Sequence, residues 1–226
     1  MMSNEFFKCE FLKKSKEINT MEELLKLFSD ITADETNLIM FDSCVAIKHA
    51  ATGKYLSSVS NLYYKTGTKD QAVFAGETLP EPNTLWIITS GSQSTREPPY
   101  NNFVFYDEEI NLTHKMTDVY LSCSHNCHSP LSKYSEIFCY TLYGSSFSID
   151  WKLKHYKTTN NCGTYVKSQD KIILQNDKHN KILRSHELEF DLNNKTYQEV
   201  VGHDERIGGN DEVYCNIISN LVCINV

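Results

Sequence analysis

A threefold internal repeat is the sequence feature that most constrains the fold of this chain. Three similar segments cover residues 45–57, 110–122 and 172–184, and the intervals between copies are 65 and 62 residues. In each copy, two apolar anchors are nine residues apart, and further landmarks follow 24, 26 and about 39 residues after the first anchor. These landmarks are Gln71, Glu136 and Gln198, then Val73, Phe138 and Val200, and finally Trp86, Trp151 and Tyr214. The repetition predicts three similar structural units.

Each repeat has the pattern of short β-strands. Apolar and polar residues alternate at the start of each copy, as at Val45 and Ile47, and period two is typical of a strand. The dipeptides Thr52-Gly53, Thr117-Asp118 and His179-Asn180 occupy the place of a tight hairpin turn. Four strands per repeat give twelve in all. Closure around a threefold axis buries their apolar faces and removes exposed edges, which favours an all-β β-trefoil over an open solenoid.

The repeated motifs resemble the MIR domain. In the first copy an apolar strand is followed by His49, Thr52-Gly53 and Lys54-Tyr55-Leu56, and the copy ends with Asn83-Thr-Leu-Trp86. The third copy carries Leu183-Arg-Ser185-His186, similar to a Leu-x-Ser-His element of that family. The family is shared by protein O-mannosyltransferases, inositol trisphosphate and ryanodine receptors, and stromal-cell-derived-factor-2-like proteins. The resemblance covers about residues 38–218 and implies a β-trefoil.

The three copies depart from the family pattern in different places. The first carries Val59-Ser60 where the Ser-His pair is expected, and the third has Asn176 and Tyr214 in place of histidine and tryptophan. These departures argue against three identical binding sites.

We expect two regions in the chain. Residues 1–37 form an N-terminal arm with an amphipathic helix at about 20–31, because Thr20-Met-Glu-Glu23 is a capping box before an apolar stripe. The arm either packs on the trefoil or docks on a partner. Residues 38–226 form the trefoil, with repeats at about 38–90, 103–157 and 164–218.

Composition restricts the partners and the compartment. The formal net charge of −7 argues against nucleic-acid binding, and no apolar run is long enough for membrane insertion. The first residues do not resemble a secretory signal, so we expect a cytoplasmic protein, or a secretory-pathway protein if a signal was trimmed. In the cytoplasm the eight cysteines are expected to be mostly free thiols.

One cluster has the residue types of a metal site. Cys123, His125, Cys127 and His128 lie within six residues, and zinc accepts such ligands. Their spacing is tighter than the usual C-x₂-C motif, and no second pair is evident. We therefore interpret the segment as a polar loop with free thiols and expect no metal or other cofactor. His49 and His114 end equivalent strands and are expected to be structural hydrogen-bonding residues.

No nucleophile elbow, phosphate-binding loop or zinc-protease motif is present in the sequence, so we do not expect an enzyme. The resemblance implies a non-catalytic module that recognises a glycan, a peptide or a protein surface through its trefoil loops. The alternative is a cytosolic regulatory or scaffolding domain of a larger signalling protein. The predicted ligand-binding residues are Ser185, His186, Glu189, Phe190, Tyr63, Tyr64 and His125.

Overall fold

The computed structural model describes residues 20–23, 25, 37–91, 102–141, 148–157 and 164–219. Within these residues the fold is almost entirely β-structure, as predicted. The strands are β1 (Cys44–His49), β2 (Leu56–Tyr63), β3 (Gln71–Ala75), β4 (Leu85–Ser90), β5 (Glu109–His114), β6 (Val119–His128), β7 (Ser135–Tyr140), β8 (Trp151–His155), β9 (Lys171–Asn176), β10 (Lys181–Leu192), β11 (Lys195–His203) and β12 (Glu212–Ser219). Two short 3₁₀ helices, η2 (Pro82–Thr84) and η3 (Gly209–Asp211), precede β4 and β12.

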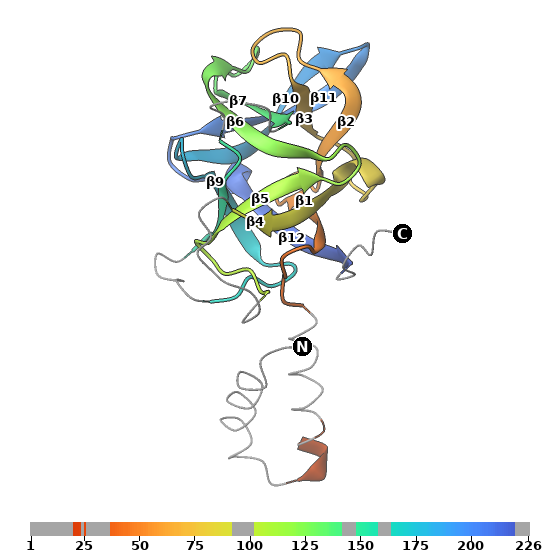
Figure 1. The fold of residues 1–226 in the computed structure, drawn as a ribbon, viewed down its shortest axis with the longest axis vertical. Coiled ribbons are helices and arrows are strands. Elements are labelled where there is room, and N and C mark those ends of the chain that lie inside the picture. The colour runs from red at the N-terminus through yellow and green to blue at the C-terminus, as the bar shows by residue number, and fades with distance from the viewer. Residues whose placement is uncertain are drawn as a thin grey trace.

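Six of the strands form a closed barrel. Antiparallel pairing runs from β1 through β4, β5, β8 and β9 to β12, which pairs again with β1. Figure 1 shows these strands in the lower part of the β-body. Because the ring closes, none of the six presents an unpaired edge along its whole length.

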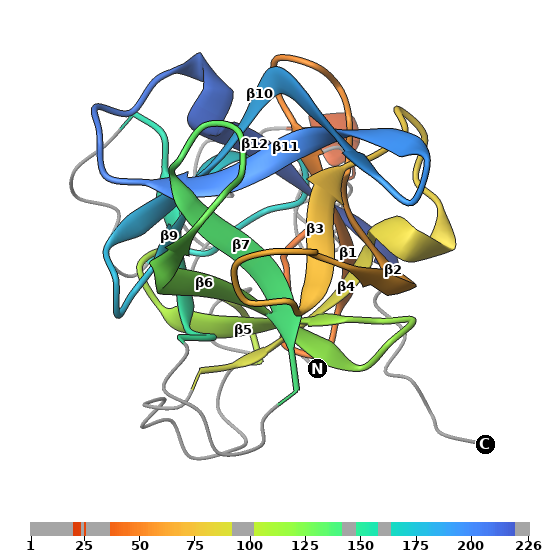
Figure 2. The same cartoon turned by 90° about the horizontal axis from the view of Figure 1, so that it is seen from above.

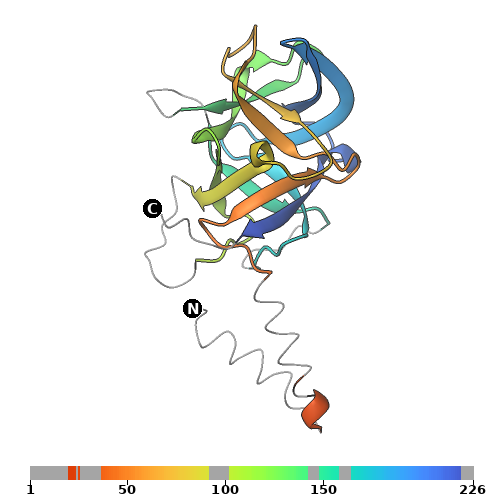
Figure 3. The same cartoon turned by 90° about the vertical axis from the view of Figure 1, so that its right-hand side faces the viewer.

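Three hairpins cover one end of this barrel. They are β2–β3, β6–β7 and β10–β11, and their inner strands β3, β7 and β11 pair with one another. Figure 2 shows the three inner strands meeting around a central axis, and Figure 3 shows the hairpins lying above the barrel. Each repeat supplies two strands to the barrel and one hairpin to its end, which makes a β-trefoil and confirms the predicted fold.

The other end of the barrel is closed by the segments that lead into each repeat. The backbone N–H of Ile39 donates to Val166 O, that of Val166 donates to Val104 O, and that of Val104 donates to Ile39 O, each over 2.9 Å. This ring of three hydrogen bonds has the threefold symmetry of the sequence repeat.

The core follows from the alternating pattern. Inward-facing aliphatic side chains fill the barrel together with Trp86 and Trp151, which are completely buried. The Trp86 indole N–H donates to Leu56 O over 3.0 Å, and that of Trp151 donates to Leu121 O over 2.9 Å. A second group, the outer cluster, lies beneath the hairpin ends and contains Leu62, Tyr64, Ala72, Phe74, Phe138, Phe190 and Leu192.

The predicted hairpin turns are confirmed. Gly53, Asp118 and Asn180 have φ angles of 72°, 53° and 52°. Glycine, aspartate and asparagine are the residues that adopt this left-handed conformation at least cost.

The strand register corrects the predicted equivalence of the third strands. On the equivalent second strands, Ser58 pairs with Val73, Cys123 with Ile137 and Ser185 with Val200. Ile137 therefore takes the place predicted for Phe138, one residue earlier in the chain. By the same shift Glu136 corresponds to Glu199 and not to Gln198.

The register also corrects the aromatic landmark of the third repeat. Val213, not Tyr214, occupies the place of Trp86 and Trp151, so the spacing needs no insertion. The partners on the two neighbouring strands are Val45 and His114 for Trp86, Ile110 and Asn176 for Trp151, and Ile172 and His49 for Val213.

The predicted capping box of the N-terminal arm is present. The Glu23 N–H donates to Thr20 Oγ1 and the Thr20 N–H donates to Glu23 Oε2, both over 3.2 Å. Most of the predicted helix at 20–31 lies outside the described residues, and the boundary at residue 37 stays a prediction.

Candidate functional site

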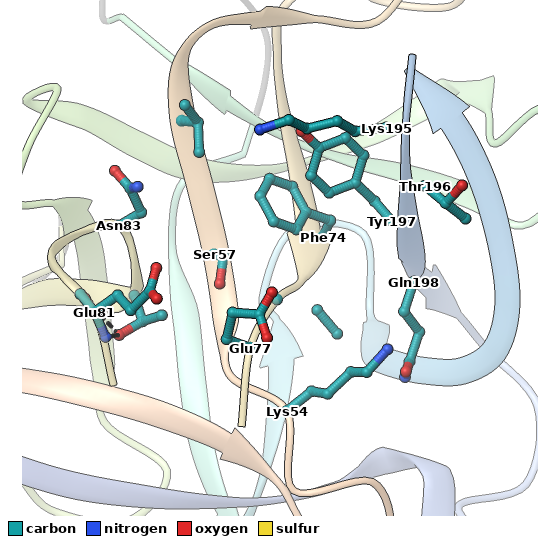
Figure 4. Close-up of a pocket in the computed structure, with 14 residues that line it drawn as sticks. Lys54, Ser57, Phe74, Glu77, Glu81, Asn83, Lys195, Thr196, Tyr197 and Gln198 are labelled. Carbon is teal, nitrogen blue, oxygen red and sulfur yellow. Dashed lines mark hydrogen bonds between the residues drawn. The ribbon is translucent and has the colours of Figure 1, made fainter. Parts of the chain in front are cut away.

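A groove of about 490 Å³ lies where the first repeat meets the third. Its walls come from β2, the end of β3, the 77–84 loop with η2, and the start of β11. Figure 4 shows Ser57 between these walls, with Glu81 and Asn83 on one side and Gln198 on the other.

Small side chains open this groove. The register places Ser57 where the third repeat has Arg184, and Gly76 where it has His203. Thr84, the last residue of η2, corresponds to Asp211, the last residue of η3. A Cβ atom added at Gly76 would lie 2.5 Å from Ser57 Oγ, so a larger residue at this position would require the Ser57 side chain to move.

In the third repeat the equivalent space is filled by an ion network. Arg184 Nε and Nη2 donate to the two oxygens of Asp211 over 2.8 and 3.2 Å, and His203 Nε2 donates to Asp211 Oδ1 over 2.9 Å. Burial acts to raise the pKa of Asp211, but hydrogen bonds from His203, Arg184 and the Gly208 N–H lower it to about 2. The charged side chains of the third repeat thus fill the space that Ser57 and Gly76 leave open in the first repeat.

The groove combines aromatic surface with polar groups. Phe74 and Tyr197 pack together at its upper end, with ring centroids 4.3 Å apart. Exposed carboxylates at Glu77 and Glu81 lie along the 77–84 loop. Lys54, just before β2, and Lys195, at the start of β11, add two ammonium groups to the lining. Such a surface can pack against an apolar face and offer both hydrogen-bond donors and acceptors to a ligand.

Ser185 and His186 lie inside the hairpin layer. The Ser185 hydroxyl is buried and donates to Glu199 O, and His186 Nε2 lies 2.6 Å from Glu199 Oε2. In the first repeat the equivalent residues are Ser58 and Val59, so the predicted alignment at 59–60 was one residue late. The contacts of Ser185 and His186 hold β10 to β11.

The aromatic residues of the predicted site are divided between core and surface. Tyr64 and Phe190 are buried in the outer cluster with ring centroids 6.1 Å apart, and the Tyr64 hydroxyl lies within hydrogen-bonding distance of two backbone carbonyls. Tyr63 is half exposed, and Glu189 is exposed, with its carboxylate 4.0 Å from the ammonium group of Lys54. None of these four lines the groove, and Glu189 reaches its rim only through the ion pair with Lys54.

The predicted metal-type cluster is dispersed. Cys123 is buried in the core, where burial raises the pKa of its thiol to about 12, while His125 and His128 are exposed. His125 instead stacks on His179 of the third repeat, with centroids 5.3 Å apart. The described part of the chain contains no group of three or more histidine, cysteine, aspartate or glutamate side chains placed to hold a metal ion.

His49 and His114 are hydrogen-bonded, as predicted. The Nδ1 atom of each ring lies 2.9 or 2.7 Å from the hydroxyl of the threonine three residues later, and Nε2 faces a backbone carbonyl across the repeat boundary. Burial lowers the pKa of both rings, so burial favours their neutral forms. Through these hydrogen bonds, His49 and His114 stabilise the first and second hairpin turns.

Sequence reasoning missed the groove. Its most informative residues, Ser57 and Gly76, are ordinary strand and loop residues when considered one at a time. That they leave space becomes evident only when they are compared with Arg184 and His203 of the third repeat. This comparison requires the correct register between repeats.

The chain is a β-trefoil module with a groove between its first and third repeats. Neither a protein-family model nor a curated protein sequence matches the chain. Among solved structures, an SDF2-like protein from Arabidopsis thaliana is 22% identical over 79% of this chain and 94% of its own, with a TM-score of 0.67. A Caenorhabditis elegans protein of unknown function is 20% identical over 80% of this chain and 97% of its own, also with a TM-score of 0.67.

A third similar structure is the Saccharomyces cerevisiae protein O-mannosyltransferase Pmt1-Pmt2 complex bound to the sugar donor. It is 22% identical over 80% of this chain and 26% of that chain, with a TM-score of 0.64. Two classes of protein named by the sequence resemblance are thus among the structures that share the fold, which confirms that resemblance. None of the helices in the described part of the chain is long and apolar enough to cross a membrane.

Proposed function

We propose that this protein is a non-catalytic binding module that takes a carbohydrate ligand in the groove between the first and third repeats. The observation that carries the proposal is the space left by Ser57 and Gly76, which Arg184 and His203 fill in the third repeat. A volume of about 490 Å³ is within the range of small-ligand sites.

The lining suits the chemistry of a sugar. A pyranose presents C–H groups that pack on aromatic carbon and hydroxyls that need both donors and acceptors. Phe74 and Tyr197 supply the aromatic carbon, and Glu77, Glu81 and Asn83 supply polar atoms on the facing wall. The similar O-mannosyltransferase complex is bound to a sugar donor, which supports carbohydrate as the ligand class.

The proposed site differs from the one predicted from sequence in its centre. Glu189 remains part of it through its ion pair with Lys54 at the rim.

We also propose a cytoplasmic location. Cys123, Cys127, Cys139 and Cys215 form no disulfide within the described part of the chain, which supports a reducing compartment.

The test uses saturation-transfer difference NMR with methyl glycosides of mannose, glucose, galactose and N-acetylglucosamine. The double variant Ser57→Arg/Thr84→Asp copies the third repeat's ion pair into the groove. Thr66→Arg, at an exposed loop residue, adds the same cation elsewhere.

We expect transfer to at least one glycoside in the unchanged protein and the Thr66→Arg variant, and its loss in the double variant. Transfer that survives the filled groove would show that the sugar binds elsewhere. No transfer to any glycoside, with binding to peptides instead, would favour the regulatory or scaffolding alternative.

A further inference from the structure

A row of alternating tyrosine and lysine side chains crosses the outer surface of the barrel. Lys48 of β1 pairs with Tyr55 on one side and with Tyr214 of β12 on the other. Tyr214 pairs in turn with Lys171 of β9. Figure 1 shows β1 and β12 side by side in the barrel, and we call this set the lysine–tyrosine row.

Cation–π contacts hold the row together. The Lys48 ammonium lies 5.8 Å from the centroid of the Tyr55 ring. The Lys171 ammonium lies 5.8 Å from the Tyr214 ring and 4.9 Å from that of Tyr156. Lys157 extends the row with its ammonium 5.1 Å from the Tyr156 ring. These contacts restrict the lysine side chains and so reduce the entropy lost when a ligand binds.

The row concentrates positive charge on a protein whose formal net charge is −7. Lys171 has a carboxylate neighbour, Glu212, at 2.8 Å. No carboxylate in the described part of the chain forms an ion pair with Lys48. Beside Lys48 is an open hollow of about 330 Å³, lined by Lys48, Gln169, Tyr214 and Asn216. Amide and phenol groups can add hydrogen bonds to any anion held there.

We propose that the lysine–tyrosine row binds an extended acidic peptide segment of a partner protein. Lys48 and Lys171 lie two strands apart, which is roughly 10 Å at the usual strand spacing. In a peptide in the extended polyproline II conformation, side chains three residues apart lie on the same side and are separated by roughly 9 Å. Carboxylates at positions i and i+3 of such a peptide match the two ammonium groups.

The same contacts argue against other classes of ligand. Nucleobases and sugars bind by stacking on exposed aromatic faces. In the row, Tyr55 is buried and the lysines lie over ring faces of Tyr156 and Tyr214. A densely charged polyanion is also repelled by the net negative charge of the rest of the protein.

The test measures fluorescence anisotropy of a fluorescein-labelled peptide, GSEGSEGS, mixed with the full chain at low salt. We expect saturable binding that weakens as the salt rises, and a loss of at least about fivefold in affinity for the glutamine peptide GSQGSQGS. The variant Lys48→Gln/Lys171→Gln is expected to lose affinity to a similar degree. Lys65→Gln, at an exposed residue of the loop between β2 and β3, is the matched control and keeps it.

Thermal unfolding checks that the double variant is folded. If it is not, Lys48→Gln alone provides the test, because it removes no ion pair between described residues. Equal binding of the two peptides, or unchanged affinity in the variants, would overturn the proposal. Tighter binding of an eight-nucleotide oligothymidylate that competes with the peptide would identify the row as a nucleic-acid surface instead.

Discussion

Three side chains of the third repeat show how a few residues change a site without changing the fold. Arg184 and His203 surround the buried carboxylate of Asp211 at positions where the first repeat has smaller residues. His203 Nδ1 accepts from the Glu205 N–H, so its Nε2 carries the hydrogen that reaches Asp211. Each partner of the buried carboxylate is therefore a donor, as a stable buried charge requires.

Removal of one hydrogen-bond donor from this network is expected to lower the stability of the folded protein. Arg184→Met leaves Asp211 buried with the His203 and Gly208 donors only, and we expect a loss of about 3–5 kcal/mol in the free energy of unfolding. Urea denaturation at neutral pH measures it. Lys181→Met is the control, because its partner Asp204 is exposed and its ion pair is screened by water, so the expected loss is much smaller.

The same network predicts how the free energy of unfolding falls at acidic pH. The folded pKa of Asp211 is lowered to about 2, so its contribution is complete above the unfolded pKa of about 4 and is lost as the pH falls towards 2. The loss between pH 4 and 2 should be smaller in Arg184→Met, where the pKa is less depressed. An equal loss in both proteins would contradict this account.

At the level of the elements, the sequence predicted the strands and turns well because they follow local rules. Alternation located the strands, and Gly53, Asp118 and Asn180 marked the turns. The one-residue offset of β7 was not predictable in this way. Each hairpin contains a register irregularity, such as that between Ser58 and Tyr63, and such bulges absorb a residue without disturbing the alternation on either side.

The loop between β2 and β3 shows how neighbouring hairpins depend on each other. Glu136 of β7 is buried, and its Oε1 accepts from the N–H and hydroxyl of Thr68 in that loop. Glu199 occupies the equivalent place in the third repeat and accepts from the hydroxyl of Ser129. Burial raises the pKa of Glu136, while the Thr68 hydrogen bonds oppose the rise.

Gly67→Ala tests this contact. Gly67 has a φ of 69°, and an added Cβ would overlap the Glu136 carboxylate. We expect a loss of about 1–3 kcal/mol in the free energy of unfolding, because the left-handed conformation and the overlap both oppose the methyl group. Gly209→Ala is the matched control, since no atom lies within 4 Å of its added Cβ. Equal stabilities of the two variants would show that the loop does not hold the Glu136 carboxylate.

At the scale of the whole molecule, the repeat was sufficient to predict closure but not the position of the groove. Closure follows from three copies of the same pattern, whatever the details of each copy. The groove depends on the differences between copies, and those differences become interpretable only after Ser57 has been superposed on Arg184. The same holds for Val213, whose smaller side chain replaces the tryptophan of the other repeats.

Closure predicts that two repeats cannot fold without the third. A chain that ends at residue 157 leaves β1 without β12, β8 without β9, and both β3 and β7 without β11. Trp86 and Trp151, which are completely buried in the whole protein, then lose part of their cover. We expect red-shifted tryptophan emission and no cooperative transition in urea, because loss of the third repeat opens the shared core of the other two repeats to water. Residues 37–226 serve as the control and should unfold cooperatively. A monomeric two-repeat chain with blue-shifted emission and a sigmoidal transition would show that the barrel does not need to close.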